Sequence, residues 1–142
     1  MSQFYIGRAD FSKGTRLQRL IIGSADENYN NTNLEALTIG NNKLLRVLDV
    51  RNCSALVAPQ DVSGCTNIEE IYFEGTGITN IKLPNGGILK TLHLPETVVN
   101  LSVINQPQLT DFYIPSYNQI STLRLENAGA LDAVALDILN VI

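Results

Sequence analysis

The side chains in this chain that are best suited to contact a ligand are those of Tyr72, His93 and Tyr113, which follow one another at intervals of 21 and 20 residues. Tyrosine combines a large contact area with a polar tip, which suits recognition of a sugar or a protein surface. Near-equal spacing is typical of repeat structures, in which equivalent residues of successive repeats lie side by side. The hypothesis of a recognition surface therefore depends on the repeats that position these residues.

A short apolar phrase recurs along the chain and accounts for this spacing. In Ile68–Ile78 (IEEIYFEGTGI), the first, fourth and sixth residues are apolar, and Thr76 takes the ninth place. Leu34–Leu44 (LEALTIGNNKL) has the same pattern, with Asn42 in the ninth place. From residue 34 onwards such phrases begin 9 to 12 residues apart and predict short strands with inward apolar residues. Their first residues are Leu34, Leu45, Leu56, Ile68, Ile78, Leu89, Val98, Leu109, Ile120 and Leu131.

One phrase is too short to close a turn around a core, so we take two phrases as one turn of 20–23 residues. Alternate phrases then form two stacks of short parallel strands, and each stack supplies the return path for the other. Gln3–Gly7 is expected to be an opening strand followed by a polar turn, and the polar loop Ser24–Asn33 to be an insertion. The first stack begins at Leu17, Leu45, Ile68, Leu89 and Leu109, and the second at Leu34, Leu56, Ile78, Val98 and Ile120.

Two stretches depart from the pattern. In Leu56–Val62, Pro59 and Asp61 fall on inward positions, so we expect an irregular half-turn there. Ala130–Val141 has apolar residues at helical spacing and predicts an amphipathic capping helix, with a further strand over Leu131–Leu136 as the alternative.

From Leu17 to Leu131 the phrases and their Cys-x-x-Leu turns resemble the leucine-rich-repeat superfamily. The resemblance implies one leucine-rich-repeat domain over residues 1–142, a β-rich solenoid of about five to six coils with strands on two faces. The segments VSGCTNIEEIYFEGTGIT and LPNGGILKTLHLPETVVNLSVINQPQLTDF resemble repeats in large tail-associated structural proteins of gut bacteriophages. This narrower resemblance implies a module of a longer virion protein with a structural or surface-binding role, and it transfers no individual binding residue.

The outward positions of the first stack gather the candidate binding residues. Between the last two inward residues of each phrase, successive coils place one column of side chains about 4.8 Å apart, the usual strand spacing. The column reads Ile21, Asp49, Tyr72, His93 and Tyr113, and the neighbouring outward column reads Val47, Glu70, Thr91 and Asp111. From these columns we predict a binding surface of Tyr72, His93, Tyr113, Asp49, Glu70 and Asp111.

An alternative interpretation is that tyrosine and histidine only stabilise the sheet by stacking on their neighbours in adjacent coils. The equivalent column of the second stack is short, polar and partly basic, which is more typical of a solvated face. Its members are Thr38, Lys82, Ser102 and Arg124.

Motifs for catalysis or for cofactors do not support an enzyme. The chain has no G-x-S-x-G, no P-loop and no histidine cluster, so we expect no catalytic residue, metal or cofactor. The loop Asp26–Asn30 opens like a calcium loop but lacks its glycine and its closing glutamate. Cys53 and Cys65 precede strand phrases in matching contexts, which favours small buried side chains over a disulfide.

Composition narrows the partner class. Ten Lys and Arg against fourteen Asp and Glu give a net charge of −4, which argues against nucleic acid as the partner. No apolar run reaches membrane-spanning length, and residues 1–11 lack the apolar region of a signal peptide. We therefore expect a protein or a surface glycan as the partner. A solenoid end without a polar cap tends to associate, so we also expect self-association through the ends, and the apolar closing residues Val141–Ile142 suggest that the natural chain continues.

These expectations combine into one functional hypothesis with one alternative. The hypothesis is a non-catalytic structural or binding module of a phage tail or similar surface protein, located in a virion or on an extracellular surface. The alternative is a free-standing adhesin-like module that recognises a glycan or a protein through Tyr72, His93 and Tyr113.

Overall fold

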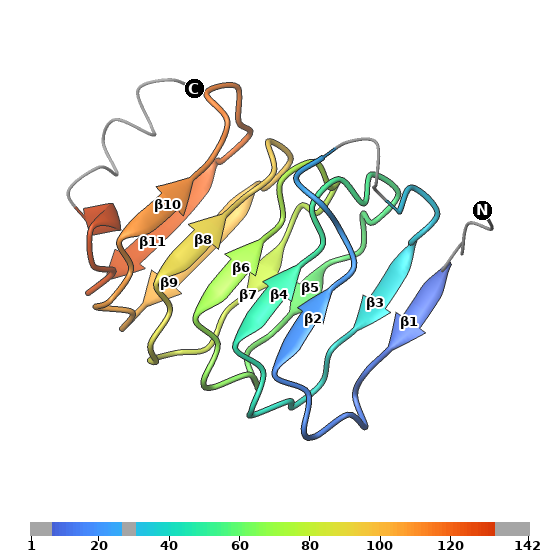
Figure 1. The fold of residues 1–142 in the computed structure, drawn as a ribbon. Coiled ribbons are helices and arrows are strands. Elements are labelled where there is room, and N and C mark those ends of the chain that lie inside the picture. The colour runs from blue at the N-terminus through green and yellow to red at the C-terminus, as the bar shows by residue number, and fades with distance from the viewer. Residues whose placement is uncertain (1–6, 27–30, 133–142) are drawn as a thin grey trace.

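Short extended segments alternate with tight turns along the whole described chain, because each apolar phrase is followed by polar, glycine or proline residues that end a strand. The computed structural model describes residues 7–26 and 31–132. These residues form a parallel β-solenoid, drawn in Figure 1. Its strands are β1 (Arg8–Asp10), β2 (Arg19–Ile21), β3 (Ala36–Thr38), β4 (Val47–Asp49), β5 (Gln60–Asp61), β6 (Glu70–Tyr72), β7 (Ile81–Lys82), β8 (Thr91–His93), β9 (Asn100–Ile104), β10 (Asp111–Tyr113) and β11 (Thr122–Glu126).

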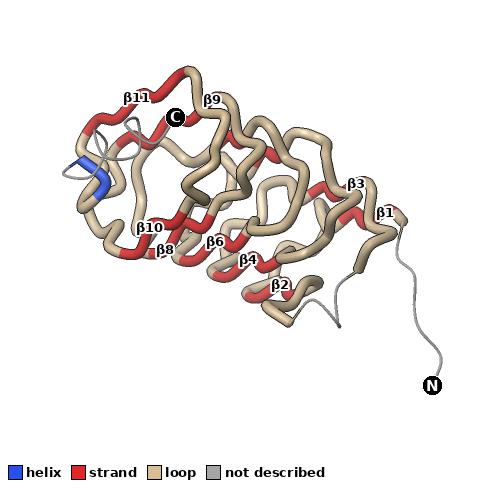
Figure 2. The backbone as a smooth tube through the Cα atoms, turned by 90° about the horizontal axis from the view of Figure 1, so that it is seen from above, coloured by secondary structure: helices blue, strands red, loops and turns tan. Residues whose placement is uncertain are grey.

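One side of the solenoid is a continuous parallel sheet of five strands in the order β10-β8-β6-β4-β2. Its register pairs the middle residues of neighbouring strands, Leu48 with Ile71 and Ile71 with Leu92. The view in Figure 2 separates this sheet from the strands on the opposite side of the coil. The expectation of parallel strands on two faces is therefore confirmed.

The opposite side is broken into three two-stranded ladders, β1-β3, β5-β7 and β11-β9. Among the described residues, an isolated bridge between Asn80 and Asn100 links the second ladder to the third, and backbone hydrogen bonds beside it, such as the one from the N–H of Gly86 to the carbonyl oxygen of Ile104 at 3.0 Å, connect the same two coils. β5 and β7 have only two residues each, so each of these coils contributes few backbone hydrogen bonds on this side.

The irregular stretch around β5 contains one extra residue before its strand. Gln60 and Val62 are buried there, whereas Asp61 is exposed. The expected break in the pattern is present: the extra residue shifts the strand by one position and exchanges its inner and outer faces, so Pro59 and Asp61, which the phrase pattern would place inward, are exposed. The buried amide of Gln60 donates to the carbonyl oxygen of Ala58 at 3.2 Å, which satisfies one of its polar groups.

The chain completes four turns from β2 to β10, one for each step between the five strands of the sheet. β1 and β11 add partial turns at the two ends, so the expected count of five to six coils is slightly too high. The first described strand begins at Arg8, within the stretch expected to be a turn. The expected opening strand Gln3–Gly7 and the expected capping helix Ala130–Val141 lie almost entirely outside the described residues.

The interior is filled by the apolar residues of the phrases, and Phe73, Ile71 and Leu92 are completely buried. Two polar residues in the ninth place of the phrase are also buried and bind the backbone at the turn. The Thr76 hydroxyl donates to the carbonyl oxygen of Phe73 at 2.8 Å. The Asn42 amide donates to the carbonyl oxygen of Phe11 at 2.8 Å and to that of Ile39. A buried carbonyl left without a donor would cost free energy, so these side chains close the turns.

The turns after β2, β4 and β6 stack on one another at van der Waals distance. A Cβ at Gly23 would lie 2.2 Å from the backbone oxygen of Arg51, so only glycine allows this approach. Asn52 has a φ of 60° and Gly75 a φ of 73°, a left-handed conformation that asparagine and glycine adopt more readily than other residues. The Asn52 amide donates to the carbonyl oxygen of Ser24 at 2.8 Å, which ties its turn to the preceding one.

Candidate functional site

The five-stranded sheet places Tyr72, His93 and Tyr113 in one column. The register pairs Tyr72 with His93 and His93 with Tyr113 across neighbouring strands β6, β8 and β10. Asp49 precedes them in the same column, opposite Tyr72. We call Tyr72, His93 and Tyr113 the ring stripe. Their ring centroids are 5.1 Å apart for Tyr72 and His93, and 5.8 Å apart for His93 and Tyr113.

Tyr72 is the most constrained member of the ring stripe. Its ring meets that of His93 edge to face, at an interplanar angle of 83°. The guanidinium of Arg51 lies over the ring, 4.6 Å from its centroid. The Tyr72 hydroxyl donates to Oε1 of Glu70 at 2.5 Å. Partial burial, and then the hydrogen bond to this carboxylate, raise the pKa of Tyr72 to about 12.

Asp49 holds Arg51 in place against the face of the Tyr72 ring. Its carboxylate accepts from Nε of Arg51 at 3.0 Å and from Nη2 at 2.6 Å, and it also accepts from the backbone N–H of Arg51 at 3.0 Å. The side chain of Asp49 is only 6% exposed, so it is not available to a ligand. Asp49 therefore orients the Arg51 cation, and the hydrogen bond between them raises the pKa of Arg51.

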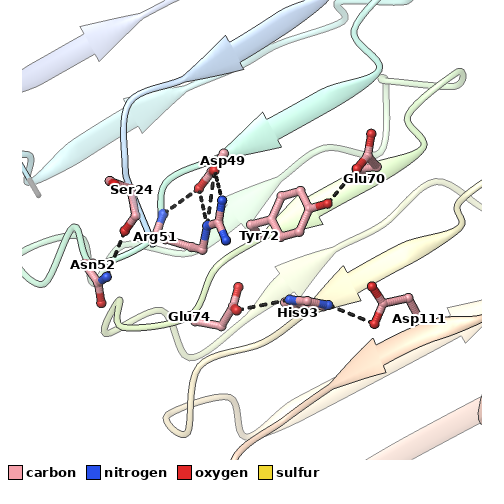
Figure 3. Close-up of polar contacts among 9 residues, drawn as sticks. All are labelled: Ser24, Asp49, Arg51, Asn52, Glu70, Tyr72, Glu74, His93 and Asp111. Carbon is pink, nitrogen blue, oxygen red and sulfur yellow. Dashed lines mark hydrogen bonds and ion pairs between the residues drawn. The ribbon is translucent and has the colours of Figure 1, made fainter. Parts of the chain in front are cut away.

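His93 lies between two carboxylates from different coils. Its Nδ1 is 3.0 Å from Oε2 of Glu74, and its Nε2 is 2.9 Å from Oδ1 of Asp111. Figure 3 shows Glu74, His93 and Asp111 in one row beside the row of Asp49, Arg51 and Tyr72. Partial burial disfavours the charged imidazole, but the hydrogen bonds to Asp111 and Glu74 outweigh it, so the pKa of His93 is raised.

Accessibility increases towards the β10 end of the ring stripe. Tyr113 is 47% exposed, whereas Tyr72 and His93 are half-buried. The side chain of Asp111, two residues before Tyr113 on the same face, is 57% exposed. Of the six predicted binding residues, Tyr113 and Asp111 are thus the ones a partner reaches most easily. Tyr72, His93, Asp49 and Glu70 mainly hold the surface in its shape.

Arg51 and Glu74 belong to this site and were not among the residues predicted from the sequence. Each lies two residues after a member of the column, Arg51 after Asp49 and Glu74 after Tyr72. Extended backbone alternates its faces with a period of two, so continuing the alternation past the strand end would have identified both residues. The turn continues the coil-to-coil pairing, since the backbone N–H of Asn52 donates to the carbonyl oxygen of Glu74 at 2.8 Å.

Beside the column, a second row of charges joins three coils. Oε1 of Glu69 accepts from Nζ of Lys90 at 2.9 Å, and Arg46 pairs with the other oxygen of the same carboxylate. The hydrogen bond to Arg46, followed by that to Lys90, lowers the pKa of Glu69. Both cations are more than half exposed, so this row contributes little to stability.

The second side of the solenoid has shallow hollows at the breaks between its ladders. One, of about 200 Å³, lies between β7 and β9 and is lined by apolar and polar residues, the polar ones including Asn80, Lys82, Asn85 and Asn100. Another, of about 290 Å³, lies between β3 and β5. The Asn100 amide donates to Oδ1 of Asn80 at 3.0 Å, and Oδ1 of Asn85 accepts from the amide of Asn105 at 3.3 Å, so these amide oxygens already have partners.

The described residues offer little for other classes of site. Within residues 7–26 and 31–132, no three His, Cys, Asp or Glu side chains are arranged to hold a metal ion. Cys53 and Cys65 are free and buried, as favoured from their contexts. In the same part of the chain, no helix has the length and apolar character needed to cross a membrane.

Comparison of this chain with protein-family models, with curated proteins and with solved structures gives no match. The fold class therefore rests on the strand pairing, and any functional conclusion rests on the ring stripe and its surroundings.

Proposed function

We propose that this chain is a leucine-rich-repeat module that binds a protein or a glycan without catalysing a reaction. The turns of 20–23 residues and the polar side chains that close them support the leucine-rich-repeat assignment. The observation that carries the binding function is the ring stripe, three ring side chains held in register on consecutive strands.

The ring stripe is ordered before any partner arrives, which favours recognition. Tyr72 is fixed by His93, Arg51 and Glu70, and His93 is fixed by two carboxylates. A surface whose side chains are already immobilised loses less conformational entropy on binding. Tyr113 then presents a half-exposed ring beside the exposed carboxylate of Asp111, a combination that can stack on a sugar or a side chain and accept hydrogen bonds.

As the setting for this module we propose a structural protein of a phage tail or a similar surface assembly. The resemblance of the repeat segments to tail-associated proteins supports this setting. Among the described residues, β2 and β10 each pair on one side only, so the sheet ends on unpaired strand edges that suit continuation into a longer stack or self-association. A free-standing adhesin is the alternative setting for the same surface.

The test is a binding screen of the purified chain against glycan arrays, cell-wall fragments and bacterial cells, with two matched variants. Tyr113→Ser removes the accessible ring of the stripe. Tyr117→Ser removes a ring that is 86% exposed but lies outside the stripe. We expect at least tenfold weaker binding for the first variant and unchanged binding for the second. If no partner is captured, or if both variants bind equally well, the recognition function is refuted and a scaffold role remains.

A further inference from the structure

The two ring nitrogens of His93 both lie at hydrogen-bond distance from carboxylate oxygens, at 3.0 Å from Glu74 and 2.9 Å from Asp111. A neutral imidazole has one N–H donor and one bare nitrogen that only accepts. An ionised carboxylate has no proton to donate, so a bare nitrogen facing it meets a second acceptor. Two ionised carboxylates can therefore be satisfied together only by the imidazolium, which donates from both nitrogens.

The three groups of this contact belong to three different coils of the solenoid. Glu74 follows β6, His93 ends β8 and Asp111 begins β10, so the contacts span three consecutive coils. His93 also touches the rings on either side of it, Tyr72 and Tyr113. A change in the charge of His93 therefore changes the electrostatic environment of both neighbouring rings in the ring stripe.

The surroundings of His93 contain more negative than positive charge. β6 and its following turn contribute Glu70 and Glu74, and β10 contributes Asp111. A cation, Arg51, lies over the ring of Tyr72, and its charge is neutralised by the ion pair with Asp49. Lys90, the residue before β8, pairs with Glu69. The titratable and charged groups around His93 are therefore Glu70, Tyr72, Glu74, Asp111 and Tyr113, with Asp49, Arg51, Glu69 and Lys90 beyond them.

We propose that His93 is a proton-operated clasp of the recognition surface: as an imidazolium it joins Glu74 to Asp111 across three coils, and on losing its proton it releases one of these carboxylates. This inference rests on the proposed binding function, since it assigns a regulation to the same ring stripe. Because the side chain of Asp111 is 57% exposed and that of Glu74 only 27%, Asp111 is the carboxylate that is freed to solvent. The clasped surface is the low-pH form, and the opened surface has lost the positive charge of the imidazolium, so the carboxylate of Asp111 beside Tyr113 is no longer compensated.

The chain has only one histidine, so its titration is directly observable. The experiment is NMR of the full chain with ¹⁵N-labelled imidazole, recorded from pH 5 to pH 9. We expect the midpoint to lie above 6.5, the ordinary value, and both ring nitrogens to be protonated below it. Asp111→Asn and Glu74→Gln should each lower this midpoint. Glu35→Gln, which removes an exposed carboxylate next to β3 on the other side of the solenoid, should leave it unchanged.

A midpoint at or below 6.5 in the unmodified chain would overturn the clasp, as would a midpoint that neither carboxylate substitution moves. These outcomes do not depend on any ligand, so they are separable from failure of the binding function. Once a partner is known, its dissociation constant should change with pH through the same midpoint in the unmodified chain. In His93→Gln, which has no titrating ring, the dissociation constant should stay constant over that range.

Discussion

Replacing Tyr72 and Tyr113 in turn by serine separates the structural from the recognition role of the ring stripe. Both residues stand in the same column of the sheet, but their environments differ. Tyr72 contacts the ring of His93, the guanidinium of Arg51 and the carboxylate of Glu70. Tyr113 contacts His93 and is 47% exposed. The two substitutions remove the same atoms, so any difference in their cost comes from the surroundings.

The expected magnitudes follow from these contacts. An edge-to-face ring pair contributes about 0.5–1.5 kcal/mol, and a partly exposed cation–π contact about 0.5–1 kcal/mol. The hydroxyl of Tyr72 adds about 0.5–1.5 kcal/mol through its hydrogen bond. We therefore expect Tyr72→Ser to lower the free energy of unfolding by about 2–3 kcal/mol. Tyr113→Ser loses one ring contact and should cost at most about 1.5 kcal/mol.

The assay is urea denaturation at pH 7, followed by circular dichroism, with the m-value compared between variants to exclude changes in the unfolded state. Tyr72→Phe serves as a matched control, because it keeps the ring contacts and removes only the hydrogen bond to Glu70. Equal costs for the two serine variants would refute the distinction between an anchored and an accessible ring. In that case the contacts of Arg51 and Glu70 with Tyr72 would contribute nothing measurable.

Phe73→Ala should lower the free energy of unfolding by about 3–5 kcal/mol in urea denaturation, because Phe73 is completely buried; a loss below about 1 kcal/mol would contradict the core assignment. Gly23→Ala should cost about 1–3 kcal/mol in the same assay, since its Cβ would collide with the backbone of the next coil, and no loss would mean that the coils can separate there. Because the pKa of His93 is raised in the folded state, its contribution to stability is complete below about pH 6.5 and is lost as the pH rises through the pKa of the folded state. The difference in melting temperature between the unmodified chain and His93→Gln should therefore shrink as the pH rises. A difference that stays constant with pH would contradict this dependence of stability on the protonation of His93. Burial raises the pKa of the Cys53 and Cys65 thiols, so a thiol reagent at pH 8 should label them only as the chain unfolds. Labelling at the rate of a free thiol would refute their burial.

The strand pattern was predictable from the sequence because it depends on local rules. Inward and outward residues alternate with a period of two, and the phrases return at intervals of 9 to 12 residues. These two facts suffice to place Asp49, Tyr72, His93 and Tyr113 in one column, and the register of the sheet agrees. The same rules failed at Leu56–Val62, where one extra residue reversed the inner and outer faces of β5.

The environments of Tyr72 and His93 were decided in large part by residues about 20 positions away in the chain. Arg51 over Tyr72, and Glu74 and Asp111 on either side of His93, come from neighbouring coils. Whether these side chains come into contact depends on the distance between neighbouring coils and on side-chain direction. The periodicity of the sequence specifies neither of these. The sequence by itself therefore determined which residues share the outer face of the sheet, through the alternation of inward and outward residues and through the length of the repeat. Only the tertiary structure decided that Arg51 and His93 pack against Tyr72 and that two carboxylates hold His93 while Tyr113 stays accessible, because those contacts exist only once the coils are stacked.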